Sequence, residues 1–96
     1  MAAGDIYQAG PTSVAAAGFL ALQPVSGTEV VIHNIYYSGA VELYYYNGTN
    51  SILFDSDASA GGRLNLTHHC SNGTYVRIKN VGAGSIFVSA DGMQTK

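Results

Sequence analysis

The sequence predicts an all-β fold: a single antiparallel β-sandwich, jelly-roll-like, with about seven or eight short strands. Two observations support this prediction. Short runs of the chain alternate apolar and polar residues with a period of two, which is the side-chain period of a strand. Turn residues such as Ser38-Gly39 and Asn47-Gly48 separate these runs at short intervals. The 96 residues leave room for one hydrophobic core, so we expect one domain.

The N-terminal residues 1–12 are expected to form an arm or an edge strand, and residues 13–96 the sandwich domain. Ile6 and Tyr7 are the large side chains that could anchor such an arm on a neighbouring subunit. The alanine content of Ser13 to Leu22 would allow a helix. However, Gly18 in the middle of a helix would cost about 1 kcal/mol relative to alanine. A strand is therefore the preferred prediction for this segment.

The middle of the chain predicts a three-stranded meander over residues 29–55. Thr28 to Tyr37 is the window with the highest β-propensity, and both of its faces are largely apolar. The Asn-Gly pair at position 47 is a strong hairpin signal. A two-residue turn places Leu43 opposite Ile52, and a four-residue turn places Leu43 opposite Phe54. Both turns keep these side chains on one face, which we expect to be the inner face.

The last third predicts a loop, a strand, a turn and a second hairpin. Residues 56–62 are long enough to cross between sheets, and residues 63–67 alternate with Leu64 and Leu66 inward. Residues 68–73 read as a polar turn. In the final hairpin a loop at residues 80–84 pairs the two flanking runs, with Arg77 opposite Phe87 on the outer face. The expected inward-facing residues are Leu43, Ile52, Phe54, Val76, Ile78, Ile86 and Val88.

The chain carries unusually few charges, and these are unevenly distributed. Charged residues make up 10% of the chain, against about 25% in a typical soluble domain. This favours a protein whose surface is largely covered by neighbours. The acids dominate up to Gly62 and the bases from Arg63 onward, so the two halves either neutralise each other internally or meet across a head-to-tail subunit contact. No basic stripe predicts nucleic-acid binding, and no apolar run predicts a signal peptide or a membrane span.

Two short motifs were weighed as metal sites. His68, His69 and Cys70, with His33 as a further candidate, contain metal-binding side chains, but adjacent strand residues point to opposite faces. Asp55 and Asp57 begin a run with the oxygen spacing of a calcium loop, which lacks the glycine and the glutamate that an EF-hand requires. We therefore predict no metal, cofactor or catalytic site, and a protein that is not an enzyme. The lone Cys70 also excludes an internal disulfide.

The tyrosines are the most unusual feature of the sequence. Alternation along the strands directs Tyr44 and Tyr46 outward together, and also one of Tyr36 and Tyr37. Three interpretations remain open: cross-strand aromatic pairing, a protein–protein contact, or stacking on sugar rings. With the N-terminal anchors, the candidate interface residues are Ile6, Tyr7, Tyr36, Tyr37, Tyr44 and Tyr46.

Three stretches share features with a known class of protein: VVIHNIYYSGAVELYYYNG, the Gly61-Gly62 loop and YVRIKNVGAGSIFVSADG. With their Asn-Gly hairpin, Lys-Asn-x-Gly segment, few charges and many small residues, they resemble the small β-sandwich decoration (cement) proteins of tailed bacteriophages. The resemblance covers roughly residues 29–92. It implies a structural virion protein, made in the bacterial cytoplasm, that reinforces or decorates the capsid. The implied partners are copies of itself, commonly in a trimer, and the major capsid protein or another virion protein. The alternative is a carbohydrate-binding or host-recognition module of a phage fibre or tail.

Overall fold

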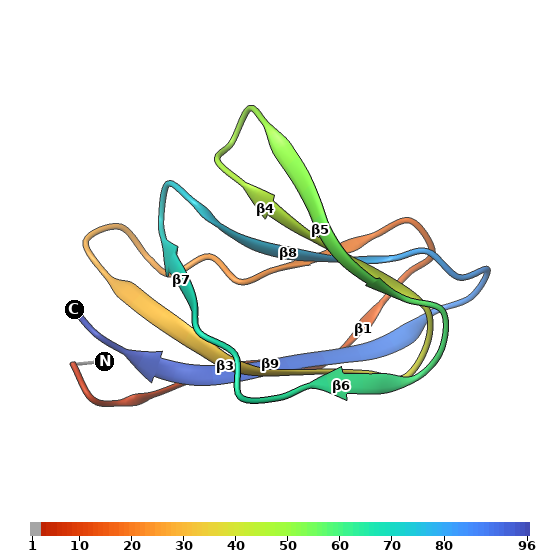
Figure 1. Cartoon of the computed structure of the whole chain (residues 1–96), viewed down its shortest axis with the longest axis horizontal. Helices are drawn as coiled ribbons and strands as arrows, with labels where there is room; N and C mark the ends of the chain where they lie inside the picture. The colour runs from red at the N-terminus through yellow and green to blue at the C-terminus, as the bar shows by residue number, and fades with distance from the viewer. Residues whose placement is uncertain (1–2) are drawn as a thin grey trace.

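The computed structural model describes residues 3–96, which form nine β-strands in two antiparallel sheets packed together (Figure 1). Sheet A has the order β1 (Ile6–Val14), β9 (Ile86–Gln94), β3 (Glu29–Tyr37), and β3 also pairs with both β6 (Gly61–Arg63) and β7 (His68–Ser71). Sheet B has the order β2 (Phe19–Ala21), β8 (Tyr75–Asn80), β4 (Val41–Tyr46), β5 (Ser51–Asp57). The prediction of a small antiparallel β-sandwich is confirmed, with nine described strands rather than seven or eight.

The chain crosses between the sheets more often than the sequence predicted. The β4–β5 hairpin and the crossing after β5 are present as expected. However, β3 and β4 belong to different sheets, and so do β8 and β9, so the predicted meander and the predicted final hairpin are wrong. Alternation determines which side chains face inward, but it does not determine which strand lies alongside. Ile78 and Ile86 therefore both contribute to the core, although from opposite sheets.

Local structure corrects two further expectations, for residues 13–22 and 68–73, and gives the segment before them one of its two expected forms. Residues from Ile6 onward form an edge strand that pairs with β9. Ile6 lies opposite Met93 at one end of this pairing, and Val14 lies opposite Ile86 at the other. A bulge interrupts this pairing at Gly10, whose φ of 78° and close approach to the Val88 carbonyl oxygen leave no space for a side chain. Residues 13–22 form two strand segments with a turn between them instead of one strand. Residues 68–71, expected in a turn, form β7.

The core fills the space between the sheets. Its most deeply buried side chains come from β3, β4, β8 and β9 and from the segment after β2: Leu22, Val30, Ile32, Ile35, Val41, Leu43, Val76, Ile78 and Val88. Ile86 and Leu66 pack against it and are partly buried. Ile52, Phe54 and Leu64 were predicted to face inward, but they are 63%, 40% and 59% exposed.

The misplaced β5 residues have a structural explanation. The hairpin loop has four residues, and it pairs Tyr45 with Ile52 and Tyr44 with Leu53. A bulge then places Leu43 opposite Asp55 and leaves Phe54 without a partner in the register. In addition, β5 is the last strand of sheet B, so its side chains lie at the rim of the sandwich.

A buried asparagine fixes the crossings at one end of the molecule. Asn80 is fully buried at the end of β8. Its side-chain Nδ2 donates to the carbonyl oxygens of Val14 at 2.9 Å and Gly84 at 2.8 Å, and its Oδ1 accepts from the Gly82 amide at 2.9 Å. Its backbone N–H donates to the Gly18 carbonyl oxygen. One residue thus satisfies the polar groups of both the β1–β2 turn and the β8–β9 crossing.

Replacing Asn80 should destabilise the protein strongly. In Asn80→Ala, the Val14 carbonyl oxygen loses its partner in a buried place, and the part-buried Gly84 carbonyl oxygen and Gly82 amide lose theirs. We therefore expect a loss of about 2–5 kcal/mol of unfolding free energy. Urea denaturation measures this loss. Asn72→Ala is the control, because Asn72 donates a single side-chain bond, to the Pro24 carbonyl oxygen, and should cost about 1 kcal/mol or less. Equal losses in the two variants would contradict the role assigned to Asn80.

The core assignment is tested by a matched pair on the β4–β5 hairpin. Leu43→Ala removes a buried side chain and should cost about 2–5 kcal/mol. Ile52→Ala removes a mostly exposed side chain and should change the stability by about 0.5 kcal/mol or less. Denaturation of dilute protein compares the two, and a large loss in Ile52→Ala would mean that β5 packs into the core of the single chain.

Candidate functional site

The structure distributes the predicted interface residues over several surfaces. Ile6 and Tyr36 are exposed on the outer face of sheet A. Tyr7 packs against the core from β1, and Tyr37 is buried. Tyr44 and Tyr46 are partly buried residues of β4 in sheet B. The six residues therefore do not form one patch, and sheet A supplies the two most exposed of them.

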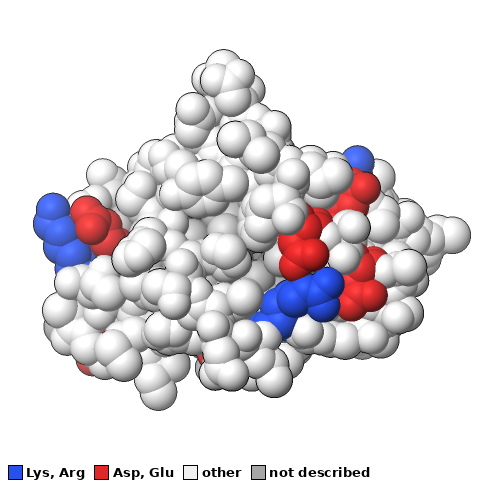
Figure 2. All heavy atoms as spheres, viewed as in Figure 1, with Lys and Arg blue, Asp and Glu red and all other residues white. Residues whose placement is uncertain are grey.

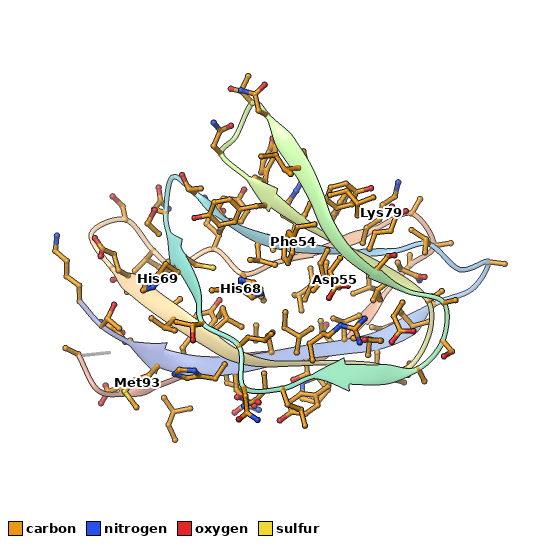
Figure 3. The ribbon with its side chains drawn as sticks, in the orientation of Figure 1. Phe54, Asp55, His68, His69, Lys79 and Met93 are labelled. Atoms are coloured by element: carbon orange, nitrogen blue, oxygen red, sulfur yellow. The ribbon has the colours of Figure 1, made fainter. Side chains whose placement is uncertain are left out.

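Sheet A has an outer face rich in exposed apolar side chains. We call it the outer apolar face, defined by Ile6, Tyr36, Leu64, Phe87 and Met93, all exposed. Ile6 lies opposite Met93 in the register, and Met93 points away from the sandwich (Figure 3). Tyr36 and Phe87 border a shallow depression of about 200 Å³. Along β9, Phe87 lies at one end of this face and Met93 at the other, with the polar residues Ser89 and Asp91 on the same side between them.

The charged residue among these side chains, Asp91, already has partners within the face. Its Oδ1 accepts a hydrogen bond from the Asn34 side-chain nitrogen at 2.7 Å. Loss of hydration, the Asp91 charge and a hydrogen bond to Asp91 together raise the pKa of Tyr36. Asp91 is therefore tied to neighbouring side chains, which reduces the cost of covering it.

Sequence reasoning identified part of this face. It placed Phe87 outward and selected Ile6 and Tyr36, but it missed Met93, which lies beyond the end of the predicted hairpin. It also placed Leu64 inside. Continuing the alternation of β9 from Phe87 would have found Met93, because both residues point to the same side of the strand.

Two aromatic rings of sheet B, Tyr46 and Phe19, pack against Arg77. The Arg77 guanidinium carbon lies 3.7 Å from the centre of the Tyr46 ring and 4.1 Å from that of Phe19. These contacts replace the predicted pairing of Arg77 with Phe87, which lies in the other sheet. A hydrogen bond from the Tyr44 hydroxyl to Glu42 raises the pKa of Tyr44. Because the Arg77 guanidinium lies over the face of the Tyr46 ring, that ring face is not free to stack on a ligand.

In the candidate calcium loop, both carboxylates form ion pairs with an arginine. Arg63 of β6 lies 2.7 Å from Asp55 through Nε and 3.4 Å from Asp57 through Nη1, and the Tyr37 hydroxyl donates to Asp57 at 2.7 Å. The Arg63 hydrogen bond lowers the pKa of Asp55, and the Tyr37 bond lowers that of Asp57. Burial and the bond to Asp57 raise the pKa of Tyr37 to about 12. These contacts join β5 of sheet B to β6 and β3 of sheet A, so the two carboxylates have a structural role.

The histidine–cysteine segment does not converge on one point. His68 and Cys70 are at least partly buried on β7, whereas His69 is exposed. His33 Nδ1 lies 3.0 Å from the Leu66 carbonyl oxygen. Within residues 3–96 no group of three or more His, Cys, Asp or Glu side chains is placed to hold a metal ion.

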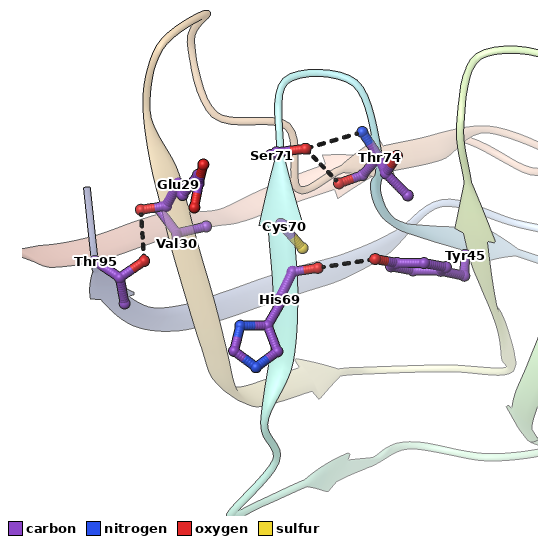
Figure 4. Close-up of a pocket in the computed structure, with 8 residues that line it drawn as sticks. All are labelled: Glu29, Val30, Tyr45, His69, Cys70, Ser71, Thr74 and Thr95. Atoms are coloured by element: carbon purple, nitrogen blue, oxygen red, sulfur yellow. Dashed lines mark hydrogen bonds between the residues drawn. The ribbon is translucent and has the colours of Figure 1, made fainter.

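Cys70 lines a cavity of about 110 Å³ between β4 and β7 (Figure 4). The Tyr45 hydroxyl bridges this space by donating to the His69 carbonyl oxygen at 3.2 Å. Burial raises the pKa of the Cys70 thiol, whereas an activated nucleophile requires a lowered pKa. The cavity is therefore a space between strands that is bordered by a thiol with no sign of activation.

The Arg63 cluster predicts a pH dependence of stability. The pKa values of Asp55 and Asp57 are below their usual 3.8 in the folded state. The ionised carboxylates therefore contribute fully to the unfolding free energy above about pH 4, and this contribution is lost as the pH falls through the lowered pKa values. Arg63→Gln should weaken this dependence. Urea midpoints at pH 7 and pH 3 measure it, with Lys96→Gln as a control that removes an exposed ion pair to Glu29. An unchanged pH dependence in Arg63→Gln would contradict the prediction.

Comparison with known proteins leaves the site to be interpreted from its geometry. Residues 3–96 include no helix long and apolar enough to span a membrane. No protein-family model matches the chain, and no curated protein matches it either.

Proposed function

We propose that this protein is a non-enzymatic structural subunit that works by binding other protein surfaces. The specific role is to decorate or stabilise the capsid of a tailed bacteriophage, as a homo-oligomer in contact with the major capsid protein or another virion protein. The resemblance of residues 29–92 to decoration proteins supports the phage role. A small β-sandwich is compatible with this role, but it serves many others as well.

The observation that carries the proposal is the outer apolar face. Interface cores are enriched in aromatic residues and methionine and depleted in charge, and this face offers Tyr36, Phe87 and Met93 around a single partnered carboxylate, Asp91. Aromatic residues and methionine exposed on one face of a sheet favour a protein-binding surface.

The distribution of charge supports the same conclusion. Figure 2 shows the charged atoms of the visible side mainly in two groups, a small one at the left end and a larger one right of centre, with a mostly uncharged surface between them. Two ion-paired groups account for much of this: Glu29 with Lys96, and Arg63 with Asp55 and Asp57. A surface with so little free charge loses little hydration energy when a neighbour covers it.

A second candidate function is glycan binding by a fibre or tail module. One observation favours it: Tyr36 and Phe87 border the shallow depression of the outer apolar face, and aromatic rings can stack on sugars. A glycan array and a capsid-binding assay separate the two functions.

The test is co-sedimentation of the purified protein with capsids of the phage that encodes it. The proposal expects saturable binding, and Phe87→Ser with Met93→Ser should weaken it at least about tenfold, the effect of losing interface hot spots. Val25→Ser is the matched control, because Val25 is equally apolar and exposed but lies in the loop before β3. Protein that remains in the supernatant with every capsid preparation would contradict the capsid role, and glycan binding abolished by Phe87→Ser would favour the alternative.

A further inference from the structure

Strand β5 is the most exposed strand of the sandwich. Three consecutive apolar residues, Ile52, Leu53 and Phe54, are 63%, 49% and 40% exposed. The strand pairs with β4 on one side, and its other side forms the free edge of sheet B, beside the protruding hairpin tip (Figure 1). In an antiparallel strand, alternate residues direct their backbone N–H and C=O groups to that free side.

This edge lacks the lysine and proline that often prevent edge strands from pairing, whereas the bulge at Phe54 is a feature that limits pairing there. Arg63 Nη2 also donates to the Ser56 carbonyl oxygen at 3.2 Å, so the open part of the edge is its first half. The carboxylates of Asp55 and Asp57 point to Arg63, so they do not form an unpaired negative barrier.

The apolar side chains lie on both sides of the strand. Leu53 is opposite Tyr44 on the outer side, whereas the Phe54 ring lies 5.1 Å from the His68 ring, towards sheet A (Figure 3). A strand added at this edge would therefore cover apolar side chains above and below while it completes the hydrogen bonds. The matching ligand is an extended backbone with apolar side chains on both of its faces.

We propose that this ligand is β5 of a second copy of the chain, paired antiparallel about a two-fold axis so that the two B sheets become one continuous sheet. The inference rests on the proposed role as an assembly subunit. A two-fold axis places identical edges against each other, and each supplies the donors, the acceptors and the apolar residues that the other lacks.

Charge does not prevent a second copy from binding. Bringing two β5 strands together brings Asp55 and Asp57 of both chains close, and Arg63 compensates these carboxylates within each chain. The net charge of −2 per chain adds little long-range repulsion. The contact uses sheet B and leaves the outer apolar face of sheet A free, so both contacts fit in one assembly.

The failed core prediction is consistent with this pairing. Ile52 and Phe54 follow the alternation of buried strand residues, yet they are exposed in the single chain. In the pair they lie beside the apolar residues of the other β5, so the sequence pattern describes burial between two chains.

The test combines sedimentation velocity with amide hydrogen exchange on the full chain. We expect a dimer at micromolar concentration and slow exchange at alternate β5 amides, with protection that increases with protein concentration. Ile52→Lys should weaken dimerisation at least about tenfold, because a desolvated lysine opposes edge pairing. It should leave the thermal melt of dilute protein nearly unchanged, since the side chain is mostly exposed. Val25→Lys, on another exposed valine, is the control and should dimerise normally.

Two results would overturn the proposal: wild-type protein that stays monomeric at about 100 μM, or a dimer whose β5 amides exchange freely and that Ile52→Lys does not weaken. Capsid binding is measured separately. A monomer that still binds capsids overturns the strand pairing alone, and a β5-paired dimer that ignores them overturns the capsid role alone.

Discussion

The buried side chain of Asn80 is the contact on which the arrangement of the two sheets depends. Four crossings lie at the right of Figure 1: after β1, β3, β5 and β8. Asn80 bonds to the first and the last of these, and its neighbour Val81 donates to Ala40 in the second. Buried backbone groups in such turns need partners, and no regular ladder supplies them there. One amide side chain, with both donor and acceptor atoms, provides partners where a hydrophobic residue could not.

The third crossing is held by Arg63, which links Asp55 and Asp57 to the strand beside Tyr37. The polar side chains of this protein thus connect its own segments, and the apolar ones are divided between the core and the surface. This division accounts for a chain that has few free charges and yet exposes aromatic and aliphatic side chains on sheet A and along β5. A surface of this kind is suited to close contact with neighbours.

Much of the fold could be predicted from periodicity and turn chemistry. The sandwich, the Asn47-Gly48 hairpin and the inward positions of Leu43, Val76, Ile78 and Val88 follow from side-chain alternation. Strand partners do not, because a short turn can lead into a neighbour in the same sheet or into the facing sheet. Asn80 shows the difficulty: in the sequence it is an ordinary loop residue before Gly82, and its function arises from Val14, distant in the chain.

The candidate site was less predictable for a related reason. Alternation identified outward side chains such as Tyr36 and Phe87, but only the pairing of β1, β9 and β3 places them on one face with Ile6 and Met93. The exposure of Ile52 and Phe54 depends on a one-residue bulge and on the edge position of β5, and local sequence signals neither.

The position of β9 also has a consequence for how the protein is made. This strand is the last of the described strands along the sequence, yet it lies in sheet A between β1 and β3. Until residues 86–94 have left the ribosome, β1 has no partner strand, and the edge of β3 that pairs with β9 is open. Because such distant pairings form slowly, a nascent chain would expose its strands to aggregation and to chaperones for the whole of its synthesis. We therefore expect the sandwich to form in one cooperative step after translation of its final strand.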